Sequence, residues 1–273
     1  MAYMASKIAN IDRMPRGGPD ASWLDRRLQT DCREYLDRDD VDERVKRSVV
    51  RALACTGEVF NNHDKFARLA LDEIADVPDP AILELGAGHG GLSRKLLEHH
   101  PTAHVTVSDV DATSVADIAR GELGRHPRAT VRVLDATAID APDGSFDLAV
   151  FALSFHHLRP RAAAQVIAEA TRVADKLLII DLPRLPAPLH IAQLGTVLPF
   201  VPFVPLLHDG FISSLRAYSP SALRALARYA DPAIRLRTRS RPWGPQVVVA
   251  SRIPATPAAR ARRKLDGFDE PST

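Results

Sequence analysis

Three glycines with alternate spacing, Gly86-x-Gly88-x-Gly90, follow an apolar run that begins at Ala81. This order predicts a buried strand, a tight turn and the start of a helix. Glycine lacks a Cβ atom, so the turn can adopt unusual backbone angles and a ligand can approach its backbone closely. Such a turn at the end of a first strand indicates a nucleotide-type cofactor, although an ordinary tight turn could show the same spacing.

Two aspartates occupy the ends of the next two predicted strands, where ligands of a doubly wound sheet bind. Asp109 ends the predicted strand 104–108, and its carboxylate can accept hydrogen bonds from both hydroxyls of a ribose. Asp135 follows the predicted strand 130–134, where it can accept from an adenine amine while Ala136 leaves room for the ring. Either aspartate alone could be an ordinary surface residue. Together with the glycine turn, in this order, they favour a cofactor site.

Histidines at two places are candidates for moving a proton, because imidazole titrates near neutral pH. His156 and His157 follow the predicted strand 146–153, at the edge of the sheet where a substrate would lie. His208 is followed by Asp209, which could orient its ring as a base, although Asp209-Gly210 could equally form a turn. We predict the three histidines as catalytic. For the adjacent pair, a role in shaping the loop is the alternative.

Strands and helices alternate along the chain from residue 81, which predicts a parallel, doubly wound α/β sheet with both faces covered. The further predicted strands are 176–181, 234–241 and 246–253, and the predicted helices are 92–98, 114–123, 160–173 and 219–229. A short turn joins the last two strands, so they must be antiparallel. Apolar residues at helical spacing between Ser22 and Ala75 predict two or three N-terminal helices.

Glu84 lies two residues before the first glycine, where NAD-binding folds usually keep an apolar residue. The run from Glu84 to Gly90, Glu-x-Gly-x-Gly-x-Gly, resembles motif I of class I S-adenosylmethionine-dependent methyltransferases. Residues 143–153, Asp-Gly-Ser-Phe-Asp-Leu-Ala-Val-Phe-Ala-Leu, resemble the fourth-strand motif of that family, and residues 155–158, Phe-His-His-Leu, are similar to the sequence that often follows it. The resemblance covers roughly residues 80–253. It departs from the family only at Ala174-Asp175-Lys176, where Lys-Pro-Gly-Gly is common.

This resemblance implies a Rossmann-like, seven-stranded sheet of order 3-2-1-4-5-7-6, with an antiparallel last strand and S-adenosyl-L-methionine as cofactor. It places the methionine part of the cofactor near the glycine turn, the ribose at Asp109 and the adenine at Asp135. No metal is predicted. The complete set of predicted cofactor residues is Glu84, Gly86, Ala87, Gly88, Asp109, Val110, Asp135, Ala136 and Phe151.

An apolar segment, Leu189–Leu207, contains no Asp, Glu, Lys or Arg over 19 residues. Its length would admit a membrane span, but three prolines within it would break a helix. We therefore predict an insert, residues 183–218, that is buried or forms a lid over an apolar or aromatic acceptor; a homodimer interface is the alternative. The predicted substrate contacts are Phe60, Asn61, Phe203, Asp209, Arg216 and Tyr218.

The chain has 273 residues, 45% of them hydrophobic, and a formal net charge of +2. This composition allows one large domain and gives no overall field that would attract nucleic acid. The start of the sequence lacks a signal-peptide pattern, and the two cysteines form no metal motif, so a cytoplasmic location is predicted. The predicted organisation is a flexible tail 1–21, a helical cap 22–76, a methyltransferase core 77–254 and a disordered tail 255–273.

The predicted function is O-methylation of a hydrophobic small molecule, such as a phenol, a quinol or a polyketide-like compound. Methylation at nitrogen or carbon is an alternative within the enzyme class. Outside it, the alternatives are a protein that binds the cofactor without methyl transfer and an NAD-type oxidoreductase.

Overall fold

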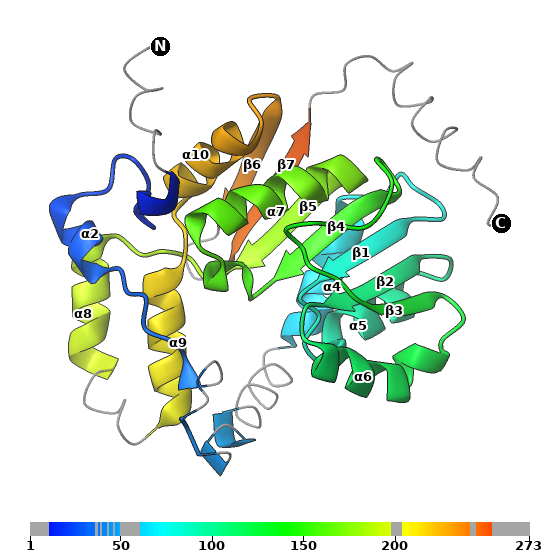
Figure 1. Ribbon diagram of the computed structural model, residues 1–273, viewed down its shortest axis with the longest axis horizontal. Coiled ribbons are helices and arrows are strands. Elements are labelled where there is room, and N and C mark those ends of the chain that lie inside the picture. The colour runs from blue at the N-terminus through cyan, green and yellow to red at the C-terminus, as the bar shows by residue number, and fades with distance from the viewer. Residues whose placement is uncertain are drawn as a thin grey trace.

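The sheet at the centre of the molecule has seven strands in the order β3-β2-β1-β4-β5-β7-β6 (Figure 1). The computed structural model describes residues 11–35, 38, 40–42, 44–45, 47–49, 61–197, 204–240 and 244–252. The strands β1 to β5 are parallel, and β7 is antiparallel to both β5 and β6. The predicted fold class, strand order and reversed last strand are thereby confirmed. The strand bounds are Ala81–Leu85, His104–Asp109, Ala129–Val133, Phe146–Ala152, Ala174–Asp181, Ile234–Ser240 and Gln246–Arg252, from β1 to β7.

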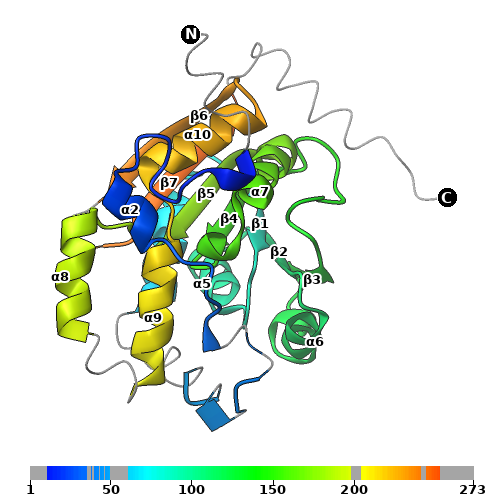
Figure 2. The ribbon, with the colours of Figure 1, turned by 60° about the vertical axis from the view of Figure 1, so that its left-hand side comes forward.

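Helices cover both faces of the sheet (Figure 2). On β1, Leu83 and Leu85 pack into one core cluster, whereas Ile82 packs into the other, because successive side chains of a strand point to opposite faces. The first face carries the short 3-10 helix η1 with α7 and α10, which span Ile11–Arg13, Pro160–Val173 and Pro220–Ala230. The second face carries α4, α5 and α6, which span Asn62–Asp72, Gly91–His99 and Ala112–Arg120.

The central strands are apolar along almost their whole length, as parallel strands covered on both faces must be. The β4 residues from Asp147 to Phe151 are all buried, and so are the last five residues of β5. The register aligns Leu85 of β1 with Ser108 of β2 and with Phe151 of β4. The carboxyl ends of these three strands therefore lie level at one edge of the sheet, on either side of the point where the strand order reverses.

The N-terminal part of the chain is packed against the core more closely than the sequence predicted. Residues 1–10 lie outside the described part, and residues 11–21, the rest of the predicted tail, make defined contacts with the core. Ile11 is buried in the core, and Arg16 is buried with its guanidinium donating to the backbone oxygen of His156 at 3.0 Å. The short helix α2 follows at Trp23–Leu28, capped by Ser22. Residues 29–35 then run back toward the strand ends, where Glu34 is buried.

The predicted insert contains two helices, α8 at Ala187–Val197 and α9 at Pro205–Arg216, which lie side by side in both views (Figures 1 and 2). Leu189 and Ile191 on α8 are 56% and 44% exposed, so these two side chains do not fit the buried alternative, and the lid stays a prediction. Residues 198–203 between the helices, which include Phe203, lie outside the described residues. Within the described part of the chain, every helix is too short or too polar to cross a bilayer.

Candidate functional site

The glycine turn connects β1 to α5 through three residues with positive φ angles, 67° at Gly86, 55° at Gly88 and 70° at Gly90. Other residue types are strained in this left-handed region. A Cβ atom on Gly86 would lie 2.8 Å from the hydroxyl oxygen of Ser154, so the backbone there is closely packed. A Cβ atom on Gly88 would meet no described atom within 4 Å. The turn is thus tightly held at its first glycine and open at its second, where a ligand can approach the backbone.

Asp109 is oriented by this turn. One oxygen of its carboxylate accepts a 2.9 Å hydrogen bond from the backbone N–H of Gly88, and the other accepts from Asp111 at 3.0 Å. Each carboxylate oxygen can accept a further bond, so Asp109 can still bind a pair of hydroxyls. Asp111 accepts instead from the first turn of α6 and acts as its N-cap. The two neighbouring aspartates therefore have different tasks.

Asp135 and Ala136 follow β3 at the same edge of the sheet. Asp135 is exposed, and one of its oxygens accepts from the backbone and hydroxyl of Thr137 at 2.8 and 2.7 Å. Ala136 is half-buried against the core. Val110, which directly follows Asp109, is 70% exposed and offers an apolar surface beside the carboxylate. These positions leave polar and apolar groups accessible at the strand ends, as an adenine site requires.

Glu84 and Phe151 lie beneath the turn rather than at its surface. The carboxyl group of Glu84 is buried and forms a very short hydrogen bond with the hydroxyl of Ser93 in α5. Burial raises the pKa of Glu84 to about 7, against the opposing effect of the Ser93 hydrogen bond. Phe151 is buried and packs edge-to-face on Phe155 with ring centroids 5.5 Å apart. In this structure both residues support the turn from below.

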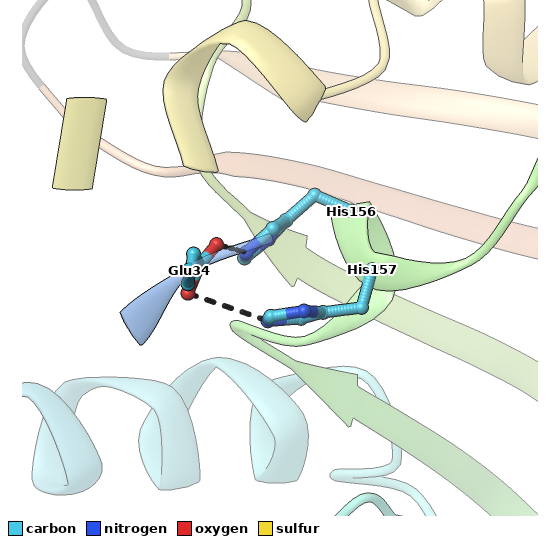
Figure 3. Close-up of side chains that lie close together, drawn as sticks. All are labelled: Glu34, His156 and His157. Carbon is cyan, nitrogen blue, oxygen red and sulfur yellow. Dashed lines mark ion pairs between the residues drawn. The ribbon is translucent and has the colours of Figure 1, made fainter. Parts of the chain in front are cut away.

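The predicted histidine pair lies in the 3-10 helix η4, Phe155–His157, next to the glycine turn. Glu34, from the N-terminal segment, faces the Nε2 edges of both rings (Figure 3). Its Oε1 atom lies 3.4 Å from Nε2 of His156, and its Oε2 atom lies 3.8 Å from Nε2 of His157. The hydroxyl of Ser213 in α9 donates to Glu34 at 2.6 Å. Segments that are far apart in the sequence thus meet at one cluster.

His156 is buried between two carboxylates. Its Nδ1 atom lies 2.7 Å from Asp181 at the end of β5, opposite to the side that faces Glu34. Burial lowers the pKa of a histidine, but here the charge and hydrogen bond of Asp181, with Glu34, outweigh it and raise the pKa of His156 to about 9. For Glu34, burial opposes ionisation, yet the two histidines and Ser213 lower its pKa. A pKa of about 9 favours the imidazolium form of His156 at neutral pH, and that form cannot accept another proton.

His208 and Asp209 lie in the first half of α9, so the turn considered for Asp209-Gly210 is absent from this described helix. Nδ1 of His208 is 2.8 Å from Asp209, and the His208 ring stacks on Tyr35 with centroids 3.9 Å apart. Asp209 also accepts from the backbone N–H of Tyr35 at 2.8 Å. His208 borders a cavity of about 590 Å³ that is also lined by Cys32, Arg33, Arg38, Asp40 and Ile212.

The predicted substrate residues are placed in several environments. Arg216 is half-buried and donates to the backbone oxygen of His157 at 3.1 Å. Tyr218 is buried and donates to Leu158 at 2.8 Å, and burial raises the pKa of its hydroxyl above the usual range, which favours a structural role. Asn61 is exposed at the N-terminus of α4 with a φ of 50°. Phe60 and Phe203 lie outside the described residues.

Three residues of the cluster were missed by sequence reasoning: Glu34, Asp181 and Ser213. Each is an ordinary polar residue in its local sequence, and the contact between Glu34 and Ser213 joins positions 179 residues apart. Asp181 carried the one usable signal, because it ends a strongly apolar strand at the edge where ligands bind.

The residues at the strand ends fit a nucleoside cofactor. The open backbone at Gly88, the oriented carboxylate of Asp109 and the exposed Val110 all lie at the edge where the strand order reverses. A doubly wound sheet binds its ligand at this edge.

Comparisons with known proteins agree with this interpretation. A family model described as a methyltransferase domain matches residues 82–176. The sequence is 40% identical over 100 residues, 36% of either chain, to a malonyl-[acyl-carrier protein] O-methyltransferase of Geobacter sulfurreducens. It is 29% identical over 102 residues to a ribosomal RNA small subunit methyltransferase A of Thermotoga petrophila, covering 37% of this chain and 38% of that protein. The chain thus matches little more than a third of the length of either curated relative.

A solved structure extends the likeness of the fold to most of the chain. The plantazolicin methyltransferase BpumL, in complex with a pentazolic desmethylPZN analog and SAH, superposes with a TM-score of 0.59 at 10% identity. The superposition covers 80% of this chain and 93% of that one.

Proposed function

We propose that this chain, which contains a class I S-adenosylmethionine-dependent methyltransferase domain with S-adenosylmethionine as its cofactor, methylates an oxygen atom of a hydrophobic small molecule. The observation that carries the proposal is the contact between the glycine turn and the histidine segment. Gly86 packs against Ser154, and Ser154 immediately precedes the helix that bears His156 and His157. A residue that can act on an acceptor hydroxyl therefore lies beside the cofactor turn.

The proposed cofactor site is the edge formed by the ends of β1, β2 and β3. Gly86, Ala87 and Gly88 would face the methionine part, Asp109 would accept from the ribose hydroxyls, and Asp135 with Ala136 would contact the adenine. S-Adenosylmethionine supplies a methyl group already activated on its sulfonium. What remains for the protein is to position the acceptor, to exclude water and to assist loss of the hydroxyl proton.

We assign the work on the acceptor hydroxyl to His157. Its side chain is 31% exposed, whereas His156 is buried and protonated and so acts as a positioning residue. Glu34 lies near Nε2 of His157 and can stabilise a positive charge that develops on the ring. His208, oriented by Asp209 and stacked on Tyr35, is the second candidate for a base.

The apolar insert supports a hydrophobic acceptor such as a phenol, a quinol or a polyketide-like compound. The α8 helix contains no Asp, Glu, Lys or Arg, and two of its large apolar side chains are exposed. An exposed apolar surface of this kind marks a ligand-binding or subunit contact. The proposed insert at 183–218 would close over the acceptor, and a homodimer contact is the alternative for α8. The net charge of +2 gives no support for a nucleic-acid acceptor.

The experiment combines calorimetry with a methyl-transfer assay. Purified protein should bind S-adenosylmethionine and S-adenosylhomocysteine but not NAD, and should label a member of a panel of phenols, quinols and polyketide-like compounds. The variant His157→Gln should retain cofactor binding and lose most methyl transfer, while the matched variant His99→Gln, in an ion pair with Asp64, should retain both. Binding of NAD alone would contradict the proposal. Full methyl transfer by His157→Gln would show that His157 is not the base and would favour His208 in that role.

A further inference from the structure

We propose that Glu34, His156 and His157 form a site for one divalent transition-metal ion, of the class represented by zinc and iron(II). Each residue offers one ligand atom to the cluster, and these three atoms all lie within 4.8 Å of one another. The rings and the carboxylate converge on a common region from two separate parts of the chain (Figure 3). The inference deepens the proposed function and rests on it only for the role of the ion.

The separation between Glu34 and His156 suits two ligands of one ion. Their Oε1 and Nε2 atoms are 3.4 Å apart. Nitrogen and oxygen atoms bound about 2.0–2.2 Å from a tetrahedral zinc ion lie about 3.3–3.5 Å from each other. A direct hydrogen bond between such groups would be shorter, at about 2.7–2.9 Å. This spacing is too long for a good hydrogen bond and matches the spacing across a metal ion.

The buried nitrogen of His156 supplies the second observation. Its Nε2 atom makes no hydrogen bond with any residue of the described part of the chain, although the side chain is only 4% exposed. A buried polar atom is normally paired. The other nitrogen, Nδ1, lies 2.7 Å from Asp181, which holds one ring proton there. Binding of a metal ion would displace the second proton, from Nε2, and leave its lone pair directed toward Glu34. Metal-binding histidines commonly have this arrangement, with a carboxylate behind the ring.

Glu34 is fixed in a similar way. The hydroxyl of Ser213 donates to its Oε1 atom at 2.6 Å, and the backbone oxygen of Asp209 in α9, 2.8 Å from the same hydroxyl, is the competing acceptor. The carboxylate therefore cannot turn away from the histidines without losing a buried hydrogen bond. Oε2 remains on the side of His157.

His157 is the third ligand, and its partial exposure leaves the site open to solvent. Its Nε2 atom lies 3.8 Å from Oε2 of Glu34, and because the ring is partly exposed it can rotate toward a shared ion. Three protein ligands leave at least one coordination position open. Two imidazoles and a single carboxylate favour zinc or iron(II) over magnesium, which prefers oxygen ligands.

The open position would lie beside the glycine turn, where the proposed acceptor hydroxyl must be. An ion there would lower the pKa of that hydroxyl. This would replace proton acceptance by His157, which would serve as a ligand instead. The competing account is an ion-pair cluster that only fastens the N-terminal segment to the strand ends.

The test is metal binding by the 273-residue chain after treatment with a chelator. Zinc chloride should bind with one ion per chain in calorimetry, and cobalt(II) chloride should give the visible absorption of a tetrahedral site. Magnesium chloride should bind far more weakly. Because Asp181 stands behind a ligand, Asp181→Asn should weaken zinc binding by about 10–100-fold. The ligand variants Glu34→Gln, which is isosteric, and His157→Gln should weaken it further.

The control is His99→Gln, which removes a histidine that also pairs with a carboxylate, Asp64, at 2.6 Å. Its zinc affinity should equal that of the wild type, and thermal melting should show that every variant is folded. No zinc binding, unchanged binding by Glu34→Gln, or an equal loss in His99→Gln would overturn the site. Zinc binding without methyl transfer to any acceptor would leave the metal site standing and count against the proposed function. Full methyl transfer in the presence of chelator would retain the function and overturn the role of the ion.

Discussion

The two halves of the candidate site are built in different ways. At the cofactor edge, the glycine turn and Asp109 lie within one short stretch of sequence and are joined through backbone N–H groups. At the acceptor edge, Glu34, His156 and Asp181 come from three separate segments and meet through their side chains. The comparison shows that residues close together in the sequence determine the cofactor edge. The acceptor edge forms only when distant segments pack together.

The same difference applies to charge. Asp109 is half-buried and takes its orientation from neutral backbone donors. The acceptor edge instead buries two carboxylates around one imidazolium. Buried charges are destabilising when one partner is removed, because the remaining charge is left without compensation. The acceptor edge should therefore be the more fragile of the two, and the cofactor edge the more important for ligand affinity.

The largest expected effect is on stability at the acceptor edge. Asp181→Asn should lower the free energy of unfolding at neutral pH by about 3–5 kcal/mol, because His156 loses a buried charged partner. Urea unfolding of the metal-free protein measures this change. The exposed pair of Asp12 with Arg161 is the control, and Asp12→Asn should leave the urea midpoint almost unchanged. Similar midpoints for both variants would erase the proposed difference between the edges.

The next effect is on cofactor affinity. Asp109→Ala should weaken S-adenosylmethionine binding by about 1.5–3 kcal/mol, which is more than tenfold in Kd, because a charged acceptor for the ribose is lost. Asp111→Ala should leave affinity nearly intact and lower the melting temperature, since Asp111 caps α6. Calorimetry and thermal melting separate the two outcomes. Equal losses of affinity would show that Asp109 is not the ribose ligand.

The smallest effect is a pH dependence that distinguishes the two edges. Glu84 has a pKa raised from 4.5 to about 7 in the folded protein. Its contribution to the free energy of unfolding is therefore complete below pH 4.5 and is lost as the pH rises through 7. The pKa of His156 is raised from 6.5 to about 9. Its contribution to the free energy of unfolding is therefore lost later, as the pH rises through 9. Glu84→Gln should remove the first decline and leave the second.

Urea unfolding from pH 4 to pH 10 provides the measurement for this comparison. The lowered pKa of Glu34 acts in the opposite direction, with a contribution that is present above its ordinary value and lost in acid. A wild-type curve that is flat between pH 4.5 and 7 would mean that Glu84 is not desolvated as the structure indicates.

Most of the fold could be predicted from the sequence because its determinants are local. The helix α7 begins at Pro160 and ends at Val173, the predicted bounds, since proline suits the first turn of a helix. The start of α6 was predicted two residues late, at Ser114, because the capping role of Asp111 sets the boundary earlier. The position of Glu34 could not be predicted, because a buried carboxylate depends on partners from distant segments.

The cofactor, catalytic and substrate contacts assigned to individual residues remain predictions. Patterns of spacing identify Asp109 and the glycine turn, since each follows directly from a strand end. Patterns of spacing carry no information about which ring of the His156–His157 pair is buried. That difference arises from the packing of α9 and the N-terminal segment around η4.

The hydrogen bond between Glu34 and Ser213 spans 179 residues and has a consequence for the order of folding. The segment that carries Glu34 leaves the ribosome early, yet its buried partners in β5 and α9 are synthesised much later. Contacts with such large sequence separation cost the most loop entropy and form late. The segment that carries Glu34 should therefore remain exposed to solvent until the sheet is nearly complete. The acceptor half of the site should form last.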